Sequence, residues 1–256
     1  MITMGIDVGN LLSKVVVLDD ERVLASGIME TTGNVASEIG GLAETVLAEA
    51  GISPGQVERT AATGSGAELV DGVDYLEDDV TCAAAAAAYY LPEINMTVDV
   101  GGQSITSILI DDDGDVVNFM RNDKCASGSG RFLEVMSNAV GVSIDDIDET
   151  VARAGKAVPI SSQCGVFAES EVITHVNEGE EPADIVAGLC EAVANIVAAQ
   201  ARRFSDGDRY TLTGGVARID SVARLITDKL SGRFYLFPHD PRLAAALGAA
   251  LLAGME

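Results

Sequence analysis

The sequence predicts an α/β fold made of two related domains. The pattern Asp7-Val8-Gly9 returns as Asp99-Val100-Gly101, 92 positions later, and an apolar strand follows each turn. Apolar residues at helical spacing alternate with these strands along the chain. The 256 residues, 48% of them hydrophobic, suffice for one large or two small globular domains. Because the same unit occurs twice, two related domains are favoured over a single sheet.

The first half of the chain predicts a hairpin followed by a helix, a strand and a second helix. The hairpin turns at Gly9-Asn10, the first helix stops at Gly51, and the second stops before Pro92. The expected elements are strands at 2–8, 14–18 and 57–62 and helices at 35–50 and 82–90. We place the domain boundary near Pro92, so that residues 1–92 and 241–256 form the first domain.

The second half repeats the hairpin and adds more helices. The expected elements are strands at 96–100, 105–110 and 210–213 and helices at 131–140, 165–176, 182–204 and 241–254. Residues 93–240 are expected to form the second domain.

The net charge and the distribution of apolar residues argue against nucleic acid and membranes as partners of this protein. The formal net charge is −24, so a polyanion is repelled and nucleic acid is not expected as a partner. No apolar run approaches the ~20 residues of a membrane span, and Met1-Ile2-Thr3-Met4 has no features of a signal peptide. We therefore expect a cytoplasmic protein that does not interact with a membrane.

The two hairpin turns carry residues suited to a magnesium nucleotide. A carboxylate at a strand end, Asp7 or Asp99, can hold a hydrated Mg²⁺ ion. Glycines in the turns let backbone N–H groups approach phosphate oxygens, and Lys14 can place a positive charge on them. Gly214-Gly215, after a later strand, can admit the flat face of a nucleotide in the same way.

Two of the four cysteines lie where a helix is expected to begin. Cys125 precedes a Gly/Ser loop that opens a helix, and Cys164 directly precedes another. A helix N-terminus has free N–H groups and a positive dipole end, which favour the thiolate form. Two thiolates are half of what a [4Fe–4S] cluster requires, and a symmetric dimer supplies the other half. Cys82 and Cys190 lie in alanine-rich helices and are expected in the core.

The ordered set of two hairpin turns and a later Gly-Gly resembles the actin/hexokinase nucleotide-binding superfamily. That resemblance implies duplicated actin-like ATPase (ribonuclease H-like) domains flanking a nucleotide cleft, with ATP or ADP and Mg²⁺ bound there. It implies catalytic roles for Asp7, Asp99 and Gln103 and nucleotide binding by Gly9, Asn10, Ser13, Lys14, Gly101, Gly102, Ser104, Gly214 and Gly215. The first turn departs from the Ser/Thr-rich run of close relatives because Asn10-Leu11-Leu12 stands there.

The cysteine segments are similar to those of the BadF/BadG/BcrA/BcrD-type ATPases. They are NDKCASGSGRFLE at 122–134 and CGVFAESEVI at 164–173, and they resemble the activators of 2-hydroxyacyl-CoA dehydratases. This resemblance implies a homodimer with one [4Fe–4S] cluster held by Cys125 and Cys164 of both chains. It also implies ATP-driven one-electron transfer from a ferredoxin or flavodoxin to an acyl-CoA dehydratase or reductase.

Three alternatives remain open from the sequence. The chain could be the ATPase subunit of a benzoyl-CoA reductase-type complex or the activator of another low-potential metalloenzyme. A small-molecule kinase of the same fold would leave Cys125 and Cys164 without a role. A nucleotide-dependent binding module that hydrolyses ATP slowly would account for Asn10-Leu11-Leu12.

Overall fold

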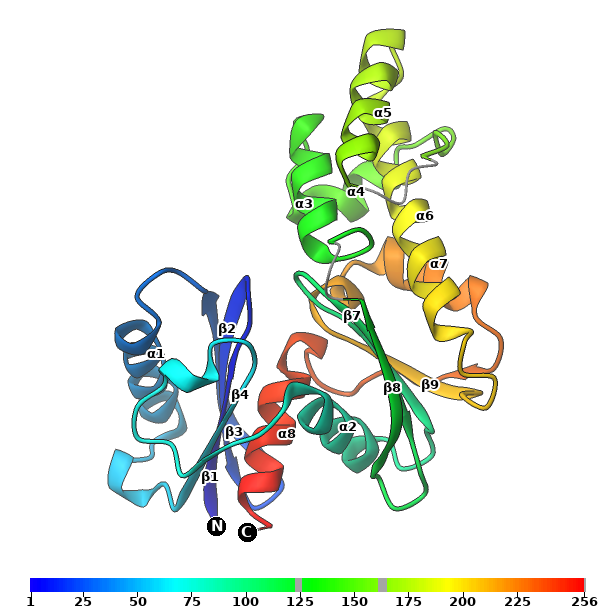
Figure 1. The fold of residues 1–256 in the computed structure, drawn as a ribbon. Coiled ribbons are helices and arrows are strands. Elements are labelled where there is room, and N and C mark those ends of the chain that lie inside the picture. Colours follow the sequence, from blue (N-terminus) through cyan, green and yellow to red (C-terminus); the bar gives the residue numbers. More distant parts are fainter. Residues whose placement is uncertain (123–125, 161–164, 256) are drawn as a thin grey trace. The chain divides into compact units, whose positions relative to one another are not determined.

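The computed structural model describes residues 1–122, 126–160 and 165–255, and it confirms the mixed α/β fold (Figure 1). The strands form two five-stranded sheets. The chain divides into two compact units. The first comprises residues 1–97, 108–119 and 236–256, and the second comprises 98–107 and 120–235.

The first sheet has the strand order β3-β2-β1-β4-β5. β1 pairs antiparallel with β2 and parallel with β4. The strands are β1 (Ile2–Val8), β2 (Leu12–Asp19), β3 (Arg22–Glu30), β4 (Arg59–Thr63) and β5 (Tyr75–Leu76). β3 was not predicted, because most of its side chains are only half-buried and its apolar residues do not alternate regularly with polar ones.

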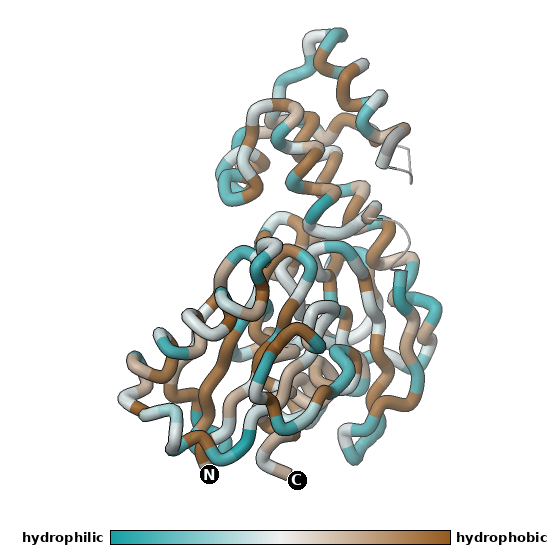
Figure 2. The backbone as a smooth tube through the Cα atoms, turned by 60° about the vertical axis from the view of Figure 1, so that its left-hand side comes forward, coloured by the Kyte–Doolittle hydropathy of each residue, from teal (hydrophilic) through white to brown (hydrophobic). Residues whose placement is uncertain are grey.

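Both faces of the first sheet are covered. Val15 and Val17 of β2 pack in one cluster with α1 (Val35–Ala50), whereas Val16 and Leu18 pack in another with α8 (Ala244–Ala253). This alternation follows the two-residue period of a strand, and both sets of side chains are apolar because both faces are buried. Figure 2 shows the apolar stretches of the backbone in brown. α2 (Asp79–Tyr90) packs against α8. Cys82 of α2 is fully buried there, as predicted.

The second sheet has the order β10-β9-β6-β7-β8. Its strands are β6 (Met96–Val100), β7 (Ile105–Ile110), β8 (Val116–Asn122), β9 (Arg209–Thr213) and β10 (Arg233–Phe234). Read from β8, this is the strand order of the first sheet, with β6 in the place of β1 and β9 in the place of β4. β8 was not predicted, and it is an edge strand with several exposed side chains.

The second unit also contains a group of helices. They are α3 (Gly130–Ala139), α4 (Ile147–Val151), α5 (Gly165–Glu178), α6 (Pro182–Ala201) and α7 (Asp220–Lys229). α6 carries the buried Cys190, whose core position was predicted.

α6 corrects the expectation that no segment is apolar enough to span a membrane. By length and composition alone its 20 residues pass that test, but 67% of its most apolar window is buried inside the structure. Gln200 near its end donates to the carbonyl oxygens of Ile105 (2.9 Å) and Met120 (2.8 Å), so the helix is tied to the second sheet as a core helix.

Candidate functional site

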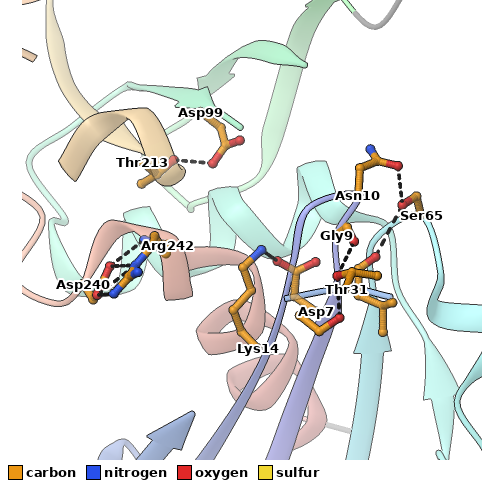
Figure 3. Close-up of polar contacts among 12 residues, drawn as sticks. Asp7, Gly9, Asn10, Lys14, Thr31, Ser65, Asp99, Thr213, Asp240 and Arg242 are labelled. Carbon is orange, nitrogen blue, oxygen red and sulfur yellow. Dashed lines mark hydrogen bonds and ion pairs between the residues drawn. The ribbon is translucent and has the colours of Figure 1, made fainter. Parts of the chain in front are cut away.

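Three hydrogen bonds stabilise the turn of the first hairpin. The N–H of Gly9 donates to the carbonyl oxygen of Leu12 at 3.1 Å, which closes the turn. Thr31, just after β3, donates its hydroxyl to the Gly9 carbonyl at 2.8 Å. Ser65, after β4, donates to Asn10 Oδ1 at 3.1 Å (Figure 3). The sequence did not single out Thr31, because one hydroxyl at a strand end has no distinguishing spacing.

Asp7 and Lys14 form an ion pair beside this turn. They are directly opposite each other in β1 and β2, and Lys14 Nζ donates to Asp7 Oδ2 at 2.8 Å. Their side chains are only 9% and 13% exposed, so water screens the pair weakly. Gly9 lies over the pair: a Cβ built on it would be 3.1 Å from Lys14 Nζ. The predicted magnesium ligand and the predicted phosphate-binding lysine therefore neutralise each other in this structure.

Ser13, another predicted nucleotide-binding residue, is almost fully buried. Its hydroxyl lies 2.8 Å from the hydroxyl of Thr31. Since Thr31 donates to Gly9, Ser13 is the donor in this contact. In this structure the Ser13 side chain supports the turn from within.

The second hairpin repeats the closure of the first. The N–H of Gly101 donates to the carbonyl oxygen of Ser104 at 2.9 Å. Thr106 stands where the first hairpin has Lys14. Asp99 Oδ2 accepts from the Thr213 hydroxyl of β9 at 2.9 Å (Figure 3). Gln103 is exposed at this turn.

A Thr-Gly pair ends the strand beside each hairpin. The pairs are Thr63-Gly64 after β4 and Thr213-Gly214 after β9. Gly64 and Gly214 have φ values of +88° and +86°, which favour glycine. A Cβ on Gly214 would be 2.5 Å from the Val100 carbonyl oxygen, whereas one on Gly215 would meet nothing within 4 Å. The repeated Thr-Gly, visible in the sequence, was a signal of the duplication that the prediction did not use.

The second turn is bonded to the start of α3. The N–H of Gly130 donates to the Gly101 carbonyl at 3.0 Å, and that of Arg131 to the Gly102 carbonyl at 2.8 Å. The first two N–H groups of α3 are therefore not free, and the Cys125 thiolate expected before this helix stays a prediction. Cys125 and Cys164 themselves lie outside the described residues. Among the described residues, no group of three or more His, Cys, Asp or Glu side chains could hold a metal ion.

Each unit thus offers a carboxylate at a strand end and a glycine turn. Carboxylate oxygens are the ligands that Mg²⁺ prefers, directly or through its water molecules. In the first unit, the Lys14 ammonium group next to Gly9 fits an anionic phosphate as well. These features match the donor set required by a magnesium nucleotide.

Comparisons with known proteins agree with this chemistry. The BadF/BadG/BcrA/BcrD ATPase family matches residues 4–253. The chain is 36% identical to the (R)-2-hydroxyglutaryl-CoA dehydratase activating ATPase of Acidaminococcus fermentans over 98% of this chain and 96% of that protein. It is 30% identical to a subunit of the benzoyl-CoA reductase of Thauera aromatica over 98% and 92% of the two chains.

Solved structures have the same fold. The activator of the 2-hydroxyisocaproyl-CoA dehydratase from Clostridium difficile, with bound ADPNP, has a TM-score of 0.92 and 33% identity, covering 99% of this chain and 94% of that one. A ROK family glucokinase from Streptomyces griseus has a TM-score of 0.63 at 15% identity and covers both chains completely, a likeness of fold alone.

Proposed function

Because the chain belongs to the BadF/BadG/BcrA/BcrD ATPase family, we propose that it is the ATP-dependent activator of a 2-hydroxyacyl-CoA dehydratase-type enzyme. It transfers one electron to that partner and couples the transfer to ATP hydrolysis. The protein works in the cytoplasm as a homodimer, without nucleic acid or membrane.

The two hairpin turns bind the nucleotide. Asp7 and Asp99 hold the hydrated Mg²⁺, and Lys14 leaves Asp7 to contact a phosphate. Gln103, exposed at the second turn, orients the water that attacks the terminal phosphate. Gly214 and Gly215 form the segment that faces adenosine. ATP and water give ADP and phosphate, and no covalent intermediate with the chain is needed.

Cys125 and Cys164 of two chains supply four thiolates for one [4Fe–4S] cluster. The cluster, when bound, supplies one-electron chemistry at low potential. A reduced ferredoxin or flavodoxin gives one electron, and the same electron leaves to the dehydratase, so the activator ends each cycle in its starting oxidation state.

One observation carries the coupling between nucleotide and electron transfer. The carbonyl oxygens of Gly101 and Gly102 accept the first N–H groups of α3, and α3 begins five residues after Cys125. A phosphate that displaces the second turn therefore displaces the start of this helix as well. Backbone hydrogen bonds transmit such a displacement directly, because neither partner can rotate away independently of its chain.

Anaerobic purification tests the proposal. We expect a brown dimer with one cluster per two chains and ATPase activity. Cys125→Ser and Cys164→Ser should each remove the cluster and leave ADPNP binding nearly intact, whereas Cys190→Ala, a change in the core, should keep both. A colourless monomer that binds ADPNP normally would contradict the proposal.

The similarity to the benzoyl-CoA reductase chain supports a second candidate, the ATPase subunit of a multi-subunit aryl-CoA reductase. In that case the cluster would form between this chain and a related chain. The chain expressed alone would then fail to assemble a cluster, and co-expression with its paralogue would restore it. An activator of another low-potential metalloenzyme would assemble as a homodimer but fail to activate a dehydratase.

A further inference from the structure

Asp7 lies between two possible hydrogen-bond donors on neighbouring strands. It is directly opposite Lys14 of β2 and directly opposite Thr63 of β4. Side chains that are opposite each other on adjacent strands project to the same face of the sheet. In this structure Lys14 donates to Asp7, and Thr63 does not.

The Thr63 hydroxyl is buried and has no strong hydrogen-bond partner in the described part of the chain. Its residue is 0% exposed, and Oγ1 has no nitrogen or oxygen partner among the described residues. The neighbouring Cys82 thiol interacts with it but is a weak hydrogen-bond partner. Burial raises the pKa of this thiol to about 12 and outweighs the Thr63 hydroxyl, which lowers it, so the thiol stays protonated. A buried hydroxyl without a strong partner costs free energy, and a hydrogen bond to the Asp7 carboxylate would remove that cost.

The second sheet contains the bond that is missing in the first. Thr213 has the position of Thr63, precedes a glycine of positive φ in the same way, and donates to Asp99 at 2.9 Å. The difference lies on the other side of the carboxylate, where the second sheet has Thr106 in place of Lys14. The hydroxyl thus bonds to the carboxylate in the hairpin that has Thr106 at this position.

We propose that Thr63 is a positioning residue for Asp7, whose carboxylate it holds once Lys14 has turned away to a phosphate. The inference rests on the proposed function, in which Lys14 contacts the nucleotide. It assigns Asp7 two alternative donors: Lys14 without nucleotide and Thr63 with it. Thr63 would then keep the carboxylate oriented toward the hydrated Mg²⁺ when the ion pair is broken.

A double-mutant cycle in nucleotide-free protein tests this without any activity measurement. Thr63→Val keeps the shape and should leave the melting temperature unchanged or raised, because it removes a buried hydroxyl whose partner is only a thiol. Lys14→Met should lower it, and the double variant should lower it by more than the sum of the two, because Asp7 then has neither donor. Thr3→Val, which removes another buried hydroxyl of the same sheet, is the control and should combine additively with Lys14→Met. Additive behaviour of Thr63→Val would overturn the proposal.

Binding of ADPNP with Mg²⁺ provides the second arm. We expect Thr63→Val to weaken it about tenfold, as for a lost hydrogen bond to a charged group, with Thr63→Ser and Thr3→Val binding like the wild type. Wild-type affinity in Thr63→Val would refute the role of Thr63 alone. Wild-type affinity in Lys14→Met would instead refute the phosphate contact of Lys14 on which the proposal depends. A fall in the nucleotide-free melting temperature of Thr63→Val would show that the hydroxyl is already bonded and would also overturn the inference.

Discussion

Gly214 and Gly215 are adjacent, yet the structure predicts opposite responses to the same substitution. At Gly214 an alanine must adopt φ of +86°, which costs about 1 to 2 kcal/mol. Its Cβ would also be 2.5 Å from the Val100 carbonyl oxygen and 2.6 Å from its carbon, and relieving such a contact costs about 1 to 3 kcal/mol. We therefore expect Gly214→Ala to lower the free energy of unfolding by about 2 to 5 kcal/mol. At Gly215 neither penalty applies.

Thermal unfolding followed by circular dichroism measures this difference. At about 2 to 4 °C per kcal/mol, Gly214→Ala should melt roughly 4 to 20 °C below the wild type. Gly215→Ala should melt within about 2 °C of it, because surface changes without strain have small effects. Its ADPNP affinity should fall, since the added methyl group lies where adenosine is proposed to pack. Equal melting temperatures for the two variants would refute the argument from backbone strain and close approach.

Three further predictions concern the supports of the site and the remaining cysteines. Thr31→Val should destabilise the protein by about 1 to 2 kcal/mol in urea unfolding, because the Gly9 carbonyl loses its donor; no change would show that this bond contributes nothing. Asp148→Ala should cost about 1 to 2 kcal/mol in the same assay, because its carboxylate accepts the N–H groups of Asp220 (3.0 Å) and Ser221 (2.7 Å) at the start of α7. Burial raises the pKa of Cys82 and Cys190 to about 12, so these two thiols are almost entirely protonated at pH 8 and react slowly. Iodoacetamide at pH 8 should therefore add at most two groups per native chain, as counted by mass spectrometry.

The sequence predicted the parts of the fold that repeat or that bury one regular face. The two Asp-Val-Gly hairpins led to the two sheets, and the helix at 35–50 was predicted with its observed bounds. β3 and β8 could not be predicted in the same way. β3 is half-buried along most of its length and β8 is largely exposed, so neither shows the alternation that marks a strand.

For the candidate site, the sequence identified the charged groups but not their supports. Asp7 was predicted to hold Mg²⁺, and Lys14 was predicted to contact a phosphate. Their ion pair depends on the register of β1 and β2, and the sequence does not determine that register because it does not determine the type of turn between the strands. Thr31 and Ser65 hold the first turn from segments far away in sequence, and such contacts leave no local pattern. The bonds from α3 to the second turn were missed for the same reason.

The lysine at position 14 and the threonine at position 106 have a consequence for how the two halves can have diverged. After the duplication, one copy of the hairpin has a positive charge opposite its aspartate and the other has a neutral hydroxyl. The copies are therefore no longer interchangeable: a chimera built from two second-type hairpins would keep both carboxylates and both turns but lose the ion pair between Lys14 and Asp7. We expect such a protein to keep both sheets and to lose the phosphate contact proposed for Lys14, so that one position separates the two copies in function.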